Sequence, residues 1–132
     1  MGATLTDVPA GMTHDLEDLF SGKPVLTIGR SRKGDIILGG GKDGERVGSN
    51  SAHDPLMTVS RTHAEIFVLH NGAYVLRHNP SAKNPTEIYS RRDGSVIRLP
   101  RDSGENTCQA ILSTGDKIRF GGYSLVVFEQ TP

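Results

Sequence analysis

Cysteine is nearly missing from this sequence, which has only Cys108 among its 132 residues. A single thiol rules out an internal disulfide, and because the five histidines are scattered along the chain, a zinc site is not expected. A chain without disulfides fits a reducing compartment, so we expect an intracellular location, cytoplasmic or nuclear. The sequence predicts neither a metal nor a cofactor.

Long apolar runs, charge of one sign and clustered aromatic residues are also lacking. No stretch approaches the roughly 20 apolar residues that span a bilayer, and the first residues show no signal-peptide pattern. Basic and acidic residues number 15 each, so the chain has no net charge that would attract it to nucleic acid or anionic lipid. The few aromatic residues, 4 Phe and 3 Tyr, form no stacking platform for single-stranded nucleic acid. We therefore expect neither nucleic acid nor a membrane as a partner.

Glycine and short apolar stretches are what the chain has instead. With 16 Gly and 7 Pro, the composition favours strands joined by turns. Candidate strands lie at residues 24–28, 35–38, 65–70, 73–78, 86–89, 96–99, 109–112, 117–120 and 123–128. Asn71-Gly72 and Gly121-Gly122 are typical hairpin turns, because these residues tolerate positive φ. The pattern predicts an all-β fold, a β-sandwich of two antiparallel sheets, in one domain over residues 23–130.

Three further segments are expected to lie outside the sheets. Residues 1–22 are predicted to be a flexible leader, with a brief helix that Thr13 caps and that runs to Phe20. Residues 39–58 and 101–107 are rich in glycine and charge or in polar residues, which indicates two surface loops.

Polar clusters stand at three strand ends or loops, where sandwich domains place their binding groups. In Ile28-Gly29-Arg30, Gly29 permits a sharp turn and Arg30 offers a planar fork of donors that suits a phosphate. Residues 60–63 supply a hydroxyl, a second cation and an imidazole directly before a strand. Residues 81–86 place a lysine beside an asparagine, whose amide can bond a peptide backbone in both directions.

Each of these residues, taken singly, also fits a structural role. Arg30 can be a solvated surface arginine and Ser60 a turn residue. His63 can be a core histidine whose ring bonds backbone groups behind the loop, and we favour this role for it. Asn84 beside Pro85 can be a turn residue with no role in binding.

Together, in this order and spacing, the clusters resemble the forkhead-associated (FHA) domain family. The resemblance covers residues 24 to 128, and its matching segments are residues 28–30, 35–38, 59–66, 81–86 and 112–121. It implies an FHA-like sandwich of about eleven strands, with loops at one end that bind a phosphothreonine-containing protein or peptide in signalling. It also implies a module that is monomeric alone and is often part of a larger protein.

The resemblance assigns roles by matched position. Arg30, Ser60, Arg61 and Lys83 would bind the phosphate, and Asn84 would bond the main chain of the peptide. Gly29 and His63 would support the site, the histidine by bracing the loop that carries Ser60.

One departure from the family pattern concerns the last loop. The family usually has Asn-Gly-Thr where this chain has Asn84-Pro85-Thr86. Proline fixes its own φ and disfavours helical backbone in the preceding residue, so Asn84 is expected to point differently or its loop to be stiffer.

Two other functions remain as alternatives. An FHA fold that has lost phosphopeptide binding would act as a phosphate-independent scaffold; Pro85 favours it, whereas retention of the two arginines and Ser60 opposes it. Ser60 and His63 could form the nucleophile and base of an enzyme, but no third catalytic residue or nucleophile elbow is evident, and we expect no enzyme. Thr4 with Asp7 three residues downstream is also a candidate phosphorylated segment for self-association.

Overall fold

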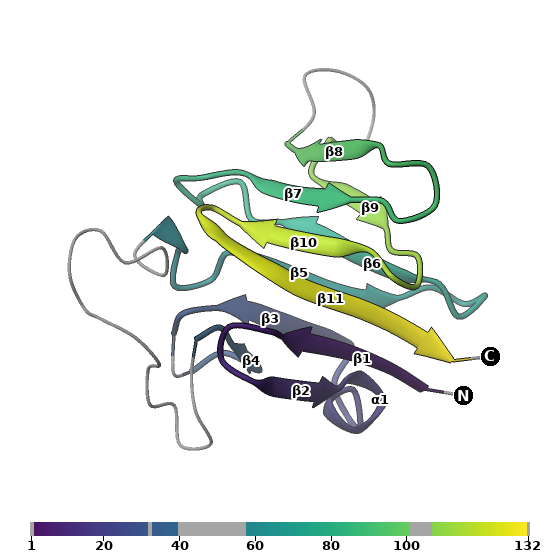
Figure 1. The fold of residues 1–132 in the computed structure, drawn as a ribbon. Helices are drawn as coiled ribbons and strands as arrows, with labels where there is room; N and C mark the ends of the chain where they lie inside the picture. The colour runs from purple at the N-terminus through teal and green to yellow at the C-terminus, as the bar shows by residue number, and fades with distance from the viewer. Residues whose placement is uncertain (1, 32, 40–57, 101–106, 132) are drawn as a thin grey trace.

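The computed structural model describes residues 2–31, 33–39, 58–100 and 107–131. These residues form eleven strands and one short helix (Figure 1). The elements are β1 (Gly2–Asp7), β2 (Met12–Asp15), α1 (Leu16–Leu19), β3 (Val25–Gly29), β4 (Ile36–Ile37), β5 (Ala64–Val68), β6 (Tyr74–His78), β7 (Thr86–Tyr89), β8 (Val96–Leu99), β9 (Gln109–Ile111), β10 (Lys117–Phe120) and β11 (Tyr123–Thr131). The described part of the chain is therefore all-β apart from one turn of α-helix.

The strands form two sheets. Sheet A has six strands in the order β2-β1-β11-β10-β7-β8, and sheet B has five in the order β4-β3-β5-β6-β9. Described pairings are antiparallel except that of β3 with β4, which is parallel and places Ile28 opposite Ile36. This β-sandwich of about eleven strands confirms the predicted fold class, with one parallel pair as an addition.

Alternating side chains explain why these segments become strands. In β10, Ile118 and Phe120 are buried while Lys117 and Arg119 face solvent, the period of two that a half-buried strand requires. The inward residues of both sheets meet in one apolar core. Its largest fully buried members include Leu5, Leu26, Ile28, Ile66, Leu76, Ile88, Phe120 and Phe128. The core holds the loops at the strand ends on a rigid support.

The predicted flexible leader over residues 1–22 is wrong for the residues described there. β1 pairs with β11 along its whole length, from Gly2 opposite Thr131 to Asp7 opposite Val126. Ala3 and Leu5 on its inner face are buried, so backbone pairing and burial both hold the segment. Residues 2–7 are therefore part of the sandwich, although the predicted boundary lies at residue 23.

The helix near the N-terminus also differs from the prediction. It covers Leu16–Leu19 only, and the side chain of Asp15 accepts a bond from the Asp18 N–H as its N-cap. Thr13, expected to be the cap, lies in β2 opposite Thr6. Residues 12–15 therefore extend a sheet, which shortens the helix to one turn.

Asp7 is a buried acid that ties the N-terminal strand to the rest of the domain. Its Oδ1 accepts a bond from the Tyr123 hydroxyl at 2.6 Å, and its Oδ2 accepts one from the Gly39 N–H at 2.7 Å. The candidate self-association through phosphorylated Thr4 does not suit this arrangement. Thr4 lies in β1, which pairs with β2 on one side and β11 on the other. Asp7, the acid three residues downstream, is buried inside the fold.

The two predicted surface loops fall largely outside the described residues, at 40–57 and 101–106. In the ranges that the structure describes, α1 is the sole α-helix, and no helix there is long and apolar enough to cross a membrane. The same ranges contain no group of His, Cys, Asp and Glu that could hold a metal ion.

The binding loops expected from the sequence gather at one end of the sandwich. In Figure 1 the β3–β4 connection, the residues leading into β5, the β6–β7 connection and the β10–β11 turn lie together on one side, and the two chain ends lie on the other. The fold thus presents segments far apart in sequence as one surface.

Candidate functional site

Gly29 is where the segment before β5 packs onto the end of β3. The His63 N–H donates to the Ile28 carbonyl at 2.8 Å, and the Ser31 N–H donates to the Arg61 carbonyl at 3.2 Å. A Cβ built on Gly29 would lie 2.0 Å from the Arg61 carbonyl oxygen, a distance that no side chain can occupy. Glycine is therefore required here for the close approach of two backbones.

Arg30 leaves β3 at this contact and is held at its base. Its Nε donates to the Val59 carbonyl at 2.7 Å, and its own N–H donates to the Ser60 carbonyl at 3.3 Å. The side chain is half-buried, and no carboxylate among the described residues forms an ion pair with it. One edge of the guanidinium is thus fixed by the backbone, which orients the charge before any ligand arrives.

Ser60 and Lys83 meet across two loops. The Ser60 Oγ accepts a hydrogen bond from the Lys83 N–H at 3.2 Å. Because the hydroxyl accepts in this bond, its own proton is left to donate to an anion. The contact brings a hydroxyl and a lysine together although 23 positions separate them in sequence.

His63 lies behind these residues with its ring fully buried. Its Nδ1 accepts a bond from the Ser60 N–H at 3.0 Å, and its Nε2 lies 3.4 Å from the Pro85 carbonyl. Nδ1 therefore carries no proton, and Nε2 is the donor. Burial is the main cause that lowers the pKa of His63 to about 4, so the ring is neutral at neutral pH. The ring bridges the backbones of two loops, the geometry that a brace requires.

Protonation of His63 is expected to destabilise the fold. Because the folded pKa lies below the ordinary 6.5, its contribution is fully present above about pH 6.5 and declines as the pH falls to about 4. The loss reaches about 3 kcal/mol, and burial shifts the pKa of His78 in the same direction. Urea unfolding at a series of pH values measures this loss of stability.

The matched variants for this prediction are His63→Gln and His70→Gln, since His70 is exposed. His63→Gln should be less stable at neutral pH and should show a shallower decline on acidification. His70→Gln should follow the wild-type curve. Equal slopes for His63→Gln and wild type would show that the ring is not the titrating group.

Asn84 is turned toward the segment before β5. Its Nδ2 donates to the Thr58 carbonyl at 2.8 Å, and the Thr58 Oγ1 accepts from the Gly122 N–H at 2.5 Å. The Pro85 carbonyl accepts from the Gly121 N–H at 2.9 Å, so the β6–β7 and β10–β11 connections are also joined directly. One N–H of the Asn84 amide is thus used within the protein, which leaves its second N–H and its carbonyl oxygen to meet a peptide.

These loops line an open cavity of about 480 Å³ at the surface, which we call the loop cavity. It is lined by Arg30, Thr58, Val59, Ser60, Arg61, Thr62, Asn79, Ser81, Lys83 and Asn84. Every residue expected to touch a ligand lies on its wall, and Gly29 and His63 lie behind it. Three cations and no carboxylate line it among the described residues, so it favours an anion.

Two residues of this site were not expected from the sequence. Thr58 bonds both Asn84 and Gly122, and Asn79 donates through its side chain to the Thr62 carbonyl at 2.8 Å. The pair Asn79-Pro80 does carry a turn signal that could have directed attention to it. Thr58 carries no local signal, because its partners lie 26 and 64 positions away.

The geometry does not support a nucleophile and base at Ser60 and His63. The ring bonds the backbone N–H of Ser60, whereas the hydroxyl accepts from Lys83 on another side. A general base must lie within reach of the proton that it removes, and here the imidazole is engaged by two backbone groups.

No family model and no curated protein matches this sequence. Solved structures are similar to it over the whole chain. The FHA domain of CT664 from Chlamydia trachomatis has a TM-score of 0.62 and 19% identity, with 100% of both chains covered. The N-terminal FHA domain of S. cerevisiae Rad53p, solved with a phosphothreonine peptide, has a TM-score of 0.60 and 18% identity, covering 99% of this chain and 94% of that one. A third structure, from a study of phosphothreonine-dependent FHA domain interactions, has a TM-score of 0.61 and 21% identity, covering 100% and 99%. This chain therefore has the FHA fold.

Proposed function

We propose that this chain is a binding module, not an enzyme, and that its loop cavity recognises phosphothreonine in a partner protein. The observation that carries the proposal is the cavity itself, with Arg30, Arg61 and Lys83 around the Ser60 hydroxyl and no carboxylate among the described lining residues. Phosphothreonine brings about −1.5 to −2 charges and three strong acceptor oxygens at neutral pH. The similar FHA domain of Rad53p was solved with such a peptide, which supports the same ligand class here.

The geometry of the loop cavity supports the roles that we assign to these residues. Arg30 is oriented by its bond to Val59, and Ser60 keeps its proton, so both are ready to donate to phosphate oxygens. Arg61 and Lys83 add positive charge, and the Asn84 carbonyl oxygen accepts from the peptide main chain. Because the loops are already bonded to one another, little ordering cost opposes binding.

A phosphate-independent scaffold is the second candidate. It is favoured by one observation, the bond from the Asn84 amide to the Thr58 carbonyl, since this bond uses one of the two N–H groups that the amide could offer to a peptide. The cations of the loop cavity have no use in such a scaffold. We further infer an intracellular protein, monomeric in isolation, that acts in signalling.

An oriented phosphothreonine peptide library, with its unphosphorylated counterpart as the control, tests the proposal. Capture on the purified protein should enrich phosphorylated peptides and should be competed by free phosphothreonine. Equal capture of the two libraries would favour the scaffold.

Affinity for a phosphothreonine peptide is expected to be highest above about pH 7 and to decline toward about pH 5. The second pKa of the phosphate lies near 6, so acidification removes a negative charge from the ligand while the arginines keep theirs. Titration calorimetry with a peptide carrying a non-titrating sulfonate in place of the phosphate is the control, because its affinity should not follow the phosphate. Equal affinity of the phosphopeptide at both ends of this range would exclude recognition of the dianion.

A further inference from the structure

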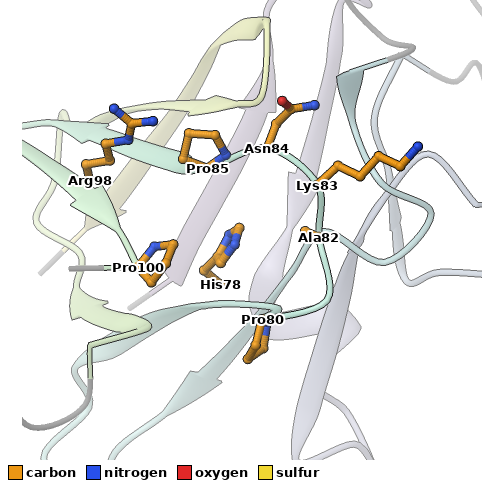
Figure 2. Close-up of a pocket in the computed structure, with 8 residues that line it drawn as sticks. All are labelled: His78, Pro80, Ala82, Lys83, Asn84, Pro85, Arg98 and Pro100. Carbon is orange, nitrogen blue, oxygen red and sulfur yellow. The ribbon is translucent and has the colours of Figure 1, made fainter. Parts of the chain in front are cut away.

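The strand β9 lies at one edge of sheet B and, in the part of the chain that the structure describes, pairs with β6 alone. It begins beside His78 at the end of β6 (Figure 2), where the His78 N–H donates to the Cys108 carbonyl at 2.6 Å. At the other end, the Leu112 N–H donates to the Tyr74 carbonyl at 2.8 Å. Bonding toward a neighbour alternates along an antiparallel strand, so residues 108, 110 and 112 direct their backbone groups to β6.

Gln109 and Ile111 therefore direct their N–H and C=O groups away from β6, to the open side of the strand. No hydrogen bond among the described residues engages these groups from that side. A row of unpaired backbone groups at a sheet edge can bond the backbone of another extended chain. The shape that complements this edge is thus an extended segment.

The sequence of β9 lacks the features with which proteins commonly protect a strand edge from pairing. Charged side chains and proline are two of these features. Residues 107–112 contain neither. The edge strands of sheet A differ in this respect, because β8 carries the exposed Arg98 and β2 ends on the exposed Asp15.

An apolar row on the outer face of sheet B ends at the same edge. The register aligns one side chain from each of β3, β5, β6 and β9, namely Val25, Phe67, Val75 and Ile111. Val75 is 2% exposed, whereas Ile111 is 58% exposed, the largest fraction among the described large apolar side chains. Ile111 thus has an apolar neighbour on the β6 side, and a further strand would cover its other side.

The charges beside this row are already paired. In the adjoining row Arg77 donates to Glu65 at 2.8 Å, and its guanidinium lies 5.1 Å from the centre of the Phe67 ring. Gln109 continues that row onto β9 with an uncharged amide. An uncharged segment therefore complements the edge, with an apolar side chain beside Ile111 and a polar one beside Gln109.

We propose that the open edge of β9, formed by Gln109 and Ile111, is a docking site for an extended, uncharged segment of a partner protein. The segment adds to sheet B as a further strand and bonds the outward N–H and C=O groups. None of residues 107–112 lines the loop cavity or the open cavity of about 540 Å³ beside His78 that Figure 2 shows. The site is therefore separate from that of the proposed function.

A second copy of this chain fits the edge less well. Two β9 strands paired about Ala110 would satisfy the outward groups of both, but each Ile111 would then lie opposite a Gln109. Pairing about Ile111 would instead set Gln109 opposite Ser113, whose N–H already donates to Asp116 at 2.8 Å. A partner segment is free of both mismatches, because it can present an apolar side chain to Ile111.

A display library of short random segments without phosphate, selected on the wild-type protein, tests the site. The enriched segments should carry apolar residues at alternate positions and lack proline. They should bind Ile111→Lys about twofold to fivefold more weakly than wild type, the size of a cross-strand pair. Val96→Lys is the matched control and should bind like wild type, since Val96 is 51% exposed on the edge strand β8 of the other sheet. Arg30→Ala, altered in the loop cavity, should also bind the segments like wild type.

Backbone methylation of a selected peptide distinguishes strand pairing from apolar contact and needs no protein variant. Methyl groups on the peptide amides that face β9 remove hydrogen-bond donors and should weaken binding about tenfold or more. Methyl groups on the amides that face away should leave the affinity unchanged. Hydrogen exchange locates the contact: the amide protons of Gln109 and Ile111 should exchange rapidly in the free protein and slowly once the peptide is bound. That of Leu112, which donates to Tyr74, should be protected in both states.

Three results would overturn the docking site: no segment selected over Ile111→Lys, equal affinity of the two methylated peptides, or unchanged exchange at Gln109 and Ile111. Protection of these two amides that rises with protein concentration alone would assign the edge to a second copy instead. Capture of phosphothreonine peptides depends on none of these results, so the proposed function is tested separately.

Discussion

Replacement of Arg30 by alanine is expected to weaken phosphothreonine-peptide binding by about thirtyfold to several thousandfold, because removal of one partner of a hydrogen-bonded charge pair costs roughly 2–5 kcal/mol. The guanidinium lies on the wall of the loop cavity, and its bond to Val59 orients it there. The fold should persist, with a loss of about 1 kcal/mol from the hydrogen bond to the Val59 carbonyl. Fluorescence anisotropy and thermal melting measure the two effects.

Two further variants sharpen this prediction. Arg30→Lys should recover part of the affinity, because an ammonium keeps the charge but lacks the planar fork. Arg92→Ala removes an exposed arginine outside the loop cavity and should bind like wild type. If Arg30→Ala binds as tightly as wild type, the assignment of the phosphate site is wrong.

Gly29→Ala is expected to have the largest effect on stability. The new methyl group would lie 2.0 Å from the Arg61 carbonyl oxygen and 2.8 Å from that of Ser60, so the segment before β5 must move. Overpacking against fixed backbone costs about 1–3 kcal/mol, and more where nothing can give way. Because the moving segment carries Ser60, phosphopeptide affinity should fall together with stability. Urea unfolding and a binding titration report the two losses.

Gly34→Ala is the matched control for Gly29. A Cβ at Gly34 would meet its nearest atom, the Ser31 carbonyl oxygen, at 3.4 Å, so the substitution should cost little. If both alanine variants unfold at the same denaturant concentration, the close approach at Gly29 does not constrain the loop.

Regular alternation made most of the sheets predictable from the sequence. β7, β8 and β10 occupy the predicted residues, and β11 begins where it was expected. β1 was missed because its inner face carries Ala3 and the charged Asp7 beside Leu5, which does not look like an apolar stripe. Inside the fold, Asp7 accepts bonds from the distant Tyr123 and Gly39 as well as from the nearby Ala10 N–H, and no local pattern encodes the two distant partners.

The sequence predicted which residues line the candidate site but not the hydrogen bonds that join them. Motif spacing predicted Arg30, Ser60 and Lys83, and the structure places all three on one cavity. The bond from Asn84 to Thr58 joins residues 26 positions apart, and no local pattern encodes such a partner.

The pairing of β1 with β11 determines how the domain would respond to mechanical tension. The strands are antiparallel, and Gly2 lies opposite Thr131, so a force that separates the chain ends acts across the ladder and not along it. Each backbone pair is then loaded in turn, from Gly2–Thr131 toward Asp7–Val126, as a zipper opens. The buried Asp7 and its bond to Tyr123 stand at the end of that path, next to the loop end of the sandwich. Tension would therefore peel the N-terminal strand from its neighbour before it reached the surface that carries Arg30 and Ser60.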